Sequence, residues 1–556
     1  MCSLPRLASR LPIAQLCTHS RRLTTNVRFR SKNYNPSKES TPKTLLEPHI
    51  LSSRLIKLCN ERQIDKAVDM LKNSPLDAQN VPVWNTLIWE CLKGKRFRLA
   101  YELYIDMKRR GHRPNTRTFQ TLMNGISRID NWDAYPKQLS HAQTIYQAFI
   151  RHVASVKQHD PSSTELSVAP IASYMKILGA AAVHQDMFDV YYSLDSDGVL
   201  TPDHFLFTAM FQALSVQPTT ESGDFLPNAA SAKLLWNLML KARRKANFPI
   251  DGHLVSSAIV ALSRGRPTDQ AFAFSLAEEH FGLSPDGDAS PRSREAKEII
   301  HLEPQSLAAI LTLCRHSSRP LYAIELFTTV LGRPESQGGA SIIDRAHVEQ
   351  ALQSLIAAGA GAPSSSQKGL ELVEWMLAQE VKLPSSTASK IRPKYSTFNL
   401  LISHLCRTDN NWPVAARAFD MMTGYHCHDF MDGVQRPTPR LDARSTGRNI
   451  SPTLEILSSM VRIAVDCQDR ANIRQALRIV HHFRIVPFLS APQSQKTFKD
   501  TYFYASKLAR AVMEGLHLLS THSGERDRPR DGDVARWKIL ESEAREVLGS
   551  EYAHAP

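Results

Sequence analysis

The chain has 556 residues, which is too many for one compact domain and indicates several domains or one elongated array. Its 42% hydrophobic and 22% charged residues are typical of a chain that buries a core, and no apolar run is long enough to form a membrane-spanning helix. A formal net charge of +14 favours contact with nucleic acid or an anionic surface, or a basic targeting segment.

The first part of the chain has the composition of a targeting segment. Residues 1–38 contain eight lysines and arginines and no acid, since the first acidic residue is Glu39. An arginine-rich, serine-rich and acid-poor start is typical of a mitochondrial transit peptide, and the sequence RRLT at 21–24 resembles a matrix-protease cleavage site. We therefore expect a mitochondrial transit peptide with a disordered basic segment at 1–38, and a location in the mitochondrial matrix.

The clearest element is the 35-residue segment 81–115, VPVWNTLIWECLKGKRFRLAYELYIDMKRRGHRPN. Apolar residues recur at helical spacing on both sides of the break at 93–95, which predicts two amphipathic helices joined by a short turn. Gly111 is expected to end the second helix, and Pro114 prevents it from resuming.

This unit resembles the pentatricopeptide repeat family. The family pattern is an aromatic residue followed by Asn-Thr-Leu-Ile, then a small residue at the start of the second helix, Leu-Phe, Met, and a Gly-x-x-Pro-Asp/Asn ending. That ending separates the family from tetratricopeptide repeats. The matching residues are Trp84, Asn85-Thr86-Leu87-Ile88, Ala100, Leu103-Tyr104, Met107 and Gly111-His112-Arg113-Pro114-Asn115.

Weaker copies of the unit follow along the chain. Each helix pair has an apolar face that it cannot bury alone, so neighbouring pairs would stack into one continuous core. The resemblance implies an all-α fold, a right-handed superhelical solenoid of antiparallel helix pairs, with about nine or ten 35-residue repeats between 48 and 490. The first helix of each pair would line the inner surface. The further units lie near 116–150, 170–203, 204–251, 252–286, 304–338 and 395–425, with degenerate copies at 48–80, 342–383 and 453–490.

The last part of the chain, residues 491–556, is expected to form C-terminal capping helices with a charged hinge at 523–533. The alternative for the whole body is an irregular all-helical domain with one chance match to the repeat. The frames at 252–286 and 304–338 favour the repeat array, because each fits 35 residues without a gap.

Pentatricopeptide repeats are known to read single-stranded RNA at one base per repeat. In the family the fifth and last residues of a unit read the base, and the second residue packs on it. Pro82 and Arg117 stand at second positions where valine is usual, and Gln120, Met175 and Ala308 are unusual fifth residues, so patchy sequence specificity is expected. A helix cap or turn residue is the competing interpretation of each Asn or Asp. The base-reading candidates are Asn85, Asn115, Thr208, Asp251, Ser256, Asp286 and Asn399.

Basic residues give a second set of candidates. The segment 93–117 holds nine lysines and arginines against two acids, and a second basic run lies at 241–245. Such cations could contact the phosphates of a bound strand. The competing interpretation is a solvated face and, for Lys108 to Arg110, compensation of the helix dipole. The phosphate-contact candidates are Lys93, Lys95, Arg96, Arg117, Arg243 and Arg244.

No catalytic, metal or cofactor site is expected. The chain has no phosphate-binding GxxxxGK[ST] motif, no GxSxG motif, and no Cys-x-x-Cys beside the His-x-Glu stretches that a zinc deaminase tail would need. The stretch His426-Cys427-His428-Asp429 lacks a second ligand pair and is expected to be structural. Eight cysteines without paired spacing favour a reducing compartment.

The sequence therefore predicts a monomeric, non-enzymatic factor that binds single-stranded mitochondrial RNA, either mRNA or rRNA. It would act in organellar RNA processing, stability or translation. Two alternatives stay open: a mitochondrial ribosome-associated or assembly component, and a protein-binding helical-repeat scaffold.

Overall fold

The computed structural model describes residues 46–551, apart from 133, 196–197, 199, 217–224, 284–298, 435–437, 490–494 and 521–530. The described residues are almost entirely helical, and their only strand-type pairing is an isolated antiparallel bridge between Tyr425 and Leu441. None of the described helices is long and apolar enough to span a bilayer.

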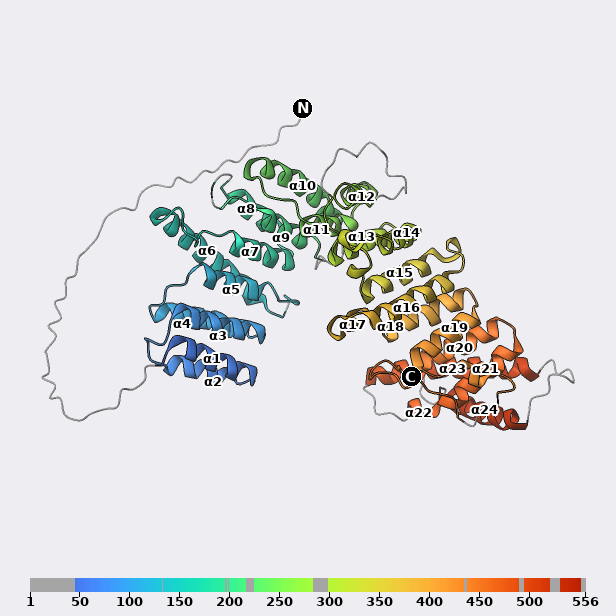
Figure 1. The fold of residues 1–556 in the computed structure, drawn as a ribbon. Coiled ribbons are helices and arrows are strands. Elements are labelled where there is room, and N and C mark those ends of the chain that lie inside the picture. The colour runs from blue at the N-terminus through green and yellow to red at the C-terminus, as the bar shows by residue number, and fades with distance from the viewer. Residues whose placement is uncertain are drawn as a thin grey trace, which may run out of the picture.

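The helices follow one another as antiparallel pairs, which confirms the all-α solenoid (Figure 1). The first helices are α1 (Pro48–Asn60), α3 (Val81–Lys93), α5 (Thr116–Ile126), α7 (Ala169–Ala180), α9 (His204–Leu214), α11 (Gly252–Ser263), α13 (Pro304–His316), α15 (Arg345–Ala358), α18 (Tyr395–Asn399) with its continuation η5 (Leu400–Cys406), α20 (Leu454–Asp466) and α23 (Gln495–Ser520). The second helices are α2 (Ile64–Asn73), α4 (Phe97–Arg109), α6 (Pro136–His159), α8 (His184–Ser193), α10 (Leu226–Ala246), α12 (Pro267–Phe281), α14 (Pro320–Leu331), α16 (Ser365–Lys382), α19 (Trp412–Thr423), α21 (Arg470–Phe483) and α24 (Asp531–Glu551).

Short elements lie in the connections between helices. They are η2 (Glu335–Gln337), η3 (Ala340–Ile342), η4 (Gly359–Gly361), α17 (Ser385–Ile391), η6 (Cys427–Phe430) and α22 (Val486–Leu489). Of these, η4 lies within the α15–α16 pair and the others lie between pairs. Most of the expected hinge at 523–533 lies outside the described residues, and α24 begins at Asp531.

The turn inside many pairs has the same conformation. In the first of them, the N–H of Gln63 bonds to the carbonyl of Leu58, and Arg62 before it has a φ of 61°. A bond from the sixth residue back to the first, around one left-handed residue, is the Schellman ending of a helix. The same left-handed position recurs in five further pairs, at Lys95, Ala182, Ser318, Asn410 and Gln468. The fold therefore repeats at the level of the backbone even where the sequence has diverged.

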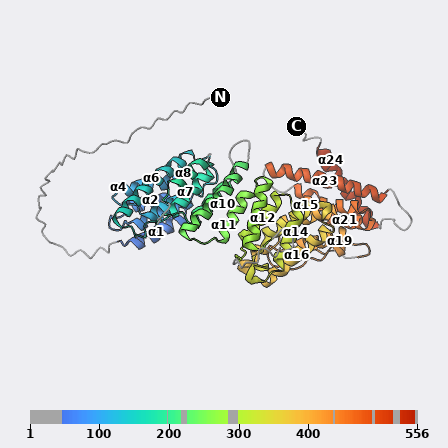
Figure 2. The same cartoon turned by 90° about the horizontal axis from the view of Figure 1, so that it is seen from above.

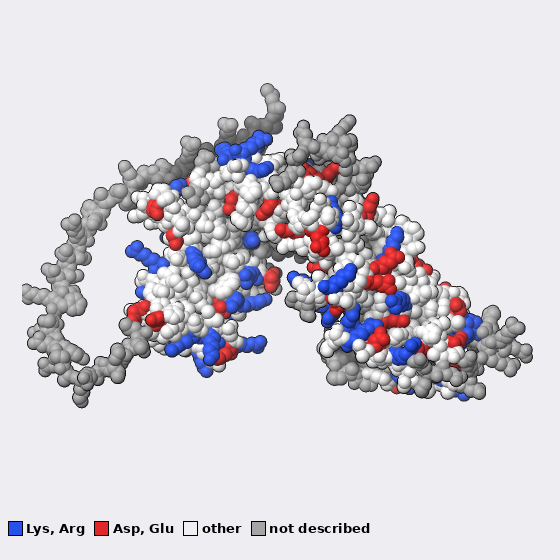
Figure 3. Space-filling model, in the orientation of Figure 1, with Lys and Arg blue, Asp and Glu red and all other residues white. Residues whose placement is uncertain are grey.

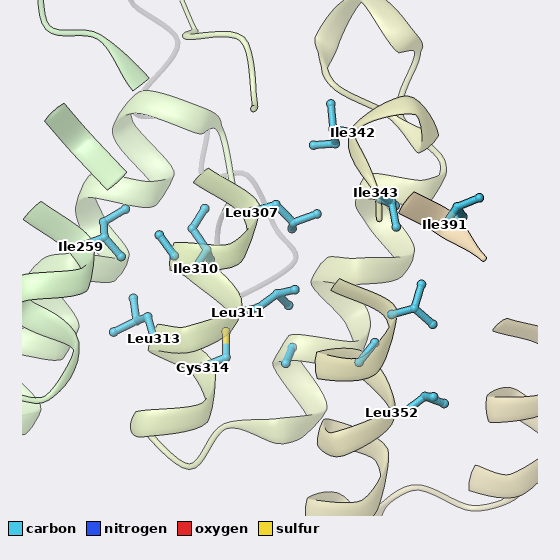
Figure 4. Packing of buried hydrophobic residues seen from close by; sticks show 14 of the residues in the cluster. Ile259, Leu307, Ile310, Leu311, Leu313, Cys314, Ile342, Ile343, Leu352 and Ile391 are labelled. Atoms are coloured by element: carbon cyan, nitrogen blue, oxygen red, sulfur yellow. The ribbon is translucent and has the colours of Figure 1, made fainter. Parts of the chain in front are cut away.

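The first helices stack on one another along the whole chain, and buried apolar residues from Leu51 to Val547 form one continuous core. Figure 4 shows this stacking at α13, where Ile310 and Leu313 point toward Ile259 of α11 while Leu311 points toward α15. Because every pair buries its apolar face against the next pair, the core runs the length of the solenoid.

The stacked pairs curve into an open arch (Figure 1). We call α1–α8 the N-terminal arm, α9–α15 the centre and α16–α24 the C-terminal arm. The first helices of both arms face the space between the arms, and the second helices lie on the outside. Seen from above, α10–α12 connect the two arms (Figure 2). The inner surface is thus built from first helices, as expected.

Gly179 lets α7 and α9 approach closely. A Cβ added there would lie 2.1 Å from Ala213 Cβ and 2.4 Å from Ala213 Cα, and the Cα cannot move without moving helix α9. Gly179→Ala is therefore expected to lower the free energy of unfolding by about 1–3 kcal/mol through overpacking, although alanine is the better helix former. Thermal unfolding would measure the loss. Gly549→Ala in α24, where a Cβ meets no atom within 4 Å, is the matched control and should be neutral or stabilising.

Candidate nucleic-acid interface

A groove of about 610 Å³ opens on the inner surface of the N-terminal arm, between α1, α3 and α5. Residues 82, 85–86 and 89 of α3 and residues 117, 120–121 and 124 of α5 recur at helical spacing, so they share the face that each helix turns toward the groove. We call it the N-terminal groove. It is lined by Ile56, Pro82, Asn85, Thr86, Trp89, Glu90, Asn115, Arg117, Gln120, Thr121 and Asn124.

Asn85 forms part of the wall of this groove. Its residue surface is 7% exposed, and its side-chain oxygen has no hydrogen-bond partner among the described residues. A buried polar atom without a partner costs free energy, and a ligand would reach this oxygen only if the side chain turned toward the groove. Asn85 thus lines the groove, and its contact with a base stays a prediction.

Asn115 combines a helix cap with a position in the groove. Its Oδ1 accepts hydrogen bonds from the backbone N–H of Thr118, at 3.0 Å, and from the Thr118 hydroxyl, at 2.9 Å. The cap interpretation is therefore correct for the oxygen. The amide nitrogen of Asn115 has no partner within the described part of the chain, so a ligand could still accept a hydrogen bond from it.

Contacts at the start of α5 hold Arg117 at the groove. Glu165 accepts a hydrogen bond from the N–H of Thr116 at 2.7 Å, and its carbonyl accepts one from the Thr116 hydroxyl at 2.5 Å. Burial raises the pKa of Glu165, but these bonds and His152 outweigh burial and hold its pKa below the ordinary value. Arg117 itself is exposed and forms no ion pair with a described residue.

The only carboxylate in the lining is already neutralised. Glu90 forms an ion pair with Lys93 at 2.8 Å. At the rim, the guanidinium of Arg128 lies 4.7 Å from the centre of the Trp89 ring, which is a cation–π arrangement. The groove therefore presents amides, one aromatic ring and the unpaired cation of Arg117.

Three of the predicted phosphate contacts are used within the protein. Besides the Lys93 pair, Lys95 lies 3.5 Å from Asp130 and Arg96 lies 2.6 Å from Asp65. Lys95 also occupies the left-handed position of the α3–α4 turn. Of the predicted phosphate contacts, only Arg117 lines the N-terminal groove, together with the base-reading candidates Asn85 and Asn115.

The remaining candidates lie elsewhere. Arg243 and Arg244 belong to α10, a second helix, and Arg243 donates to the carbonyl of Phe248. Thr208 donates to the carbonyl of His204 in its own helix, and Asp251 caps α11. These assignments stay predictions.

Of three further candidates, Ser256 is buried, Asn399 is half-buried and Asp286 is not described. Ser256 bonds to the carbonyl of Gly252 and to the hydroxyl of Ser306, so its hydroxyl is occupied inside the protein. The side-chain oxygen of Asn399 is buried without a partner among the described residues. Asp286 lies outside the described residues.

Trp89, Thr86 and Asn124 line the groove but were not singled out from the sequence. Trp89 stands four residues after Asn85, one helical turn along the same face. That spacing could have identified it.

Residues 79–128, which include α3, α4 and α5, match the model of the PPR repeat family. This segment is therefore similar to a pentatricopeptide repeat. The match confirms the resemblance that the sequence carried, and it covers both main walls of the N-terminal groove. A comparison with curated proteins found no match.

Solved structures of pentatricopeptide repeat proteins also align with the chain. The crystal structure of PPR10 in complex with an 18-nt psaJ RNA element has 14% identity and a TM-score of 0.46, with 90% of this chain and 60% of that chain covered. A cysteine-to-serine variant of PPR10 in the same kind of complex gives the same values. PPR10 from maize has 13% identity and a TM-score of 0.20, with 91% and 84% covered. The chain thus spans about 60% of the length of the first two proteins.

Proposed function

We propose that this chain binds single-stranded RNA on its inner surface, with the N-terminal groove as a base-reading site. The observation that carries the proposal is that the second, fifth and last positions of the repeat at 81–115 meet in one groove. They do so together with Arg117 and Gln120 of the next unit, inside the segment that matches the family.

The chemistry of the groove suits an unpaired base. A base splayed out of a single strand offers donors and acceptors along its Watson–Crick edge, and asparagine amides can complement both. Pro82 and the guanidinium of Arg117 lie at the second positions of adjacent units and can flank the faces of the base. Arg117 is also available to a phosphate, because its side chain is exposed and no described acid is paired with it.

We further propose that the protein works in the mitochondrial matrix, in the processing, stability or translation of organellar transcripts. The support is the composition of residues 1–38, which lie outside the described residues. A fluorescent fusion of the full chain should enter mitochondria, and a fusion that lacks residues 1–38 should not. Import of the truncated fusion would contradict the assignment.

The RNA-binding proposal predicts that Arg117→Glu weakens binding of single-stranded RNA by about tenfold or more, because a phosphate contact becomes a repulsion. Asn85→Ala should instead change which bases are preferred. Filter binding with a random-sequence RNA pool, followed by sequencing of the bound fraction, measures both effects.

Arg98→Glu is the matched control for this experiment. It makes the same change of charge on α4, an outer helix, where Arg98 is paired with Glu102. Equal weakening by Arg117→Glu and Arg98→Glu would show that net charge and not the groove determines binding.

A further inference from the structure

A second groove lies on the inner surface at the other end of the arch. It measures about 400 Å³ and runs between η5, α20 and α23, three successive first helices. We call it the C-terminal groove. It is lined by Ser403, His404, Arg407, Glu455, Ser458, Ser459, Arg462, Tyr504 and Lys507.

The cations of this groove differ from those of the basic repeat. Arg407, Arg462 and Lys507 form no ion pair or hydrogen bond through their side chains with any described residue, whereas Lys93, Lys95 and Arg96 are all paired with acids. Glu455 is the only acid in the lining, and it accepts a hydrogen bond from the hydroxyl of Tyr395 at 2.8 Å. The groove therefore carries excess positive charge.

Two aromatic rings lie beside one of these cations, Lys507. The Nζ of Lys507 is 4.3 Å from the ring centre of Phe503 and 5.7 Å from that of Tyr504. Phe503 is 56% exposed, so its ring is accessible to a ligand. Cations that track a backbone, next to rings on which bases stack, are the features of single-strand binding surfaces.

The wall made by η5 is itself unusual. Residues Leu400–Cys406 form a π-helix, the only one in the described part of the chain. Such segments are rare and occur frequently at functional sites. Here the π-helix carries Ser403 and His404 into the groove, and the Ser403 hydroxyl bonds to that of Ser459 at 2.9 Å.

In the centre of the arch the N-cap positions of the first helices are acidic. Four consecutive first helices, α9, α11, α13 and α15, have an acidic residue at the N-cap position: Asp203, Asp251, Glu303 and Asp344. The corresponding residues are Glu47, Asn80, Asn115 and Val168 in the N-terminal arm and Lys394 and Thr453 in the C-terminal arm, so no other stretch has consecutive acidic N-caps among the described first helices. Acidic side chains gather near α11 and α13 in Figure 3. A row of carboxylates repels phosphates.

We propose that the C-terminal groove binds the phosphates and bases of single-stranded RNA, so that one strand contacts both arms and bypasses the row of acidic N-caps in the centre. This inference rests on the proposed function and adds a second contact region to it. Arg407, Arg462 and Lys507 hold phosphates, and Phe503 and Tyr504 stack on bases.

Salt dependence of RNA binding tests the proposal. The full chain would be titrated with a long random-sequence single-stranded RNA at several salt concentrations. In the variant Arg407→Ala/Arg462→Ala/Lys507→Ala we expect the slope of log K against log salt to fall by about 2, since each phosphate contact on a single strand contributes about 0.7. Affinity at low salt should fall by about tenfold or more.

A matched control removes the same charge from outer helices. Arg98→Ala/Arg417→Ala/Arg545→Ala takes away three exposed arginines that are each paired with an acid on the surface. This variant should bind RNA as the wild type does, and both variants should melt at the wild-type temperature. Weakening of binding by both variants to the same extent would overturn the proposal.

Crosslinking locates the strand directly. RNA that carries 4-thiouridine should crosslink to peptides that contain Trp89 and to peptides that contain Phe503, but not to peptides from α9–α13. Phe503→Ala should remove the second crosslink. If the wild type binds RNA and the C-terminal variant binds equally well, the inference fails while the proposed function stands. If the wild type binds no RNA, the proposed function itself fails.

Discussion

Replacing Arg478 with alanine is expected to lower the free energy of unfolding of the C-terminal helix pairs by about 3–5 kcal/mol. Arg478 is 9% exposed and joins three separate segments. Its guanidinium donates to Asp533 of α24 at 2.7 Å, to Asp432 at 2.6 Å and to the carbonyl of Phe430 at 2.8 Å. Without it, Asp533, which is 3% exposed, would be a buried carboxylate that has lost its main partner.

Arg536→Ala is the control for this variant. Arg536 contacts the same carboxylate at 3.0 Å, but its side chain is 45% exposed, so its removal should cost less than about 1 kcal/mol. Urea denaturation would compare the two variants. If both variants lost the same free energy of unfolding, the burial of Arg478 would not determine how much it contributes to stability.

The Arg478 cluster also predicts how stability depends on pH. Burial raises the pKa of Asp533 and of Asp432, but hydrogen bonds from Arg478 and neighbouring arginines outweigh burial and hold both pKa values below the ordinary one. A lowered folded pKa gives stability that is complete above the unfolded value of about 3.9 and is lost as pH falls through the folded pKa. Acid should therefore destabilise the wild type more steeply than Arg478→Ala.

Trp84→Ala is expected to lower the free energy of unfolding by about 3–5 kcal/mol. It should also abolish RNA binding at the N-terminal groove. Trp84 is fully buried in α3, where its ring lies 6.1 Å from that of His112 and 5.9 Å from the Arg110 guanidinium. The cavity left by its removal would be next to Asn85, so α3 would lose the geometry that forms the groove wall. Calorimetry and RNA titration on the same preparation measure the two effects.

Trp89→Ala separates packing from binding. Trp89 is the same residue type in the same helix, but it is only half-buried and lines the groove. Its loss should leave the melting temperature nearly unchanged and weaken RNA binding. If Trp84→Ala melts like the wild type, the core described for this repeat is wrong.

The best repeat could be predicted in detail because residues within its own sequence mark where its helices end. Gly111, Pro114 and Asn115 mark the end of one pair and the start of the next, and the structure places α3 and α4 at Val81–Lys93 and Phe97–Arg109. The turn inside each pair is not marked in this way. Its left-handed residue is Arg62, Lys95, Ala182, Ser318, Asn410 or Gln468, so no glycine identifies the position in any of these units.

The site was predictable only where it depends on spacing within one repeat. Asn85 and Asn115 follow from their positions in the unit. The pairing of Lys95 with Asp130 and of Arg96 with Asp65 does not follow from position in the unit. Asp130 is 35 residues from Lys95 and Asp65 is 31 residues from Arg96, and both acids belong to neighbouring units. The C-terminal groove collects Arg407, Arg462 and Lys507 from three units, and no local excess of charge identifies them.

The shape of the arch bears on how a strand reaches the inner surface. The two arms do not close on each other, and the space between them is open along one side (Figures 1 and 3). A ring-shaped clamp has to be threaded from a free end or opened, whereas this surface can receive a strand laterally. An internal stretch of a long transcript, or a circular RNA with no ends, is therefore as accessible to it as a short linear fragment.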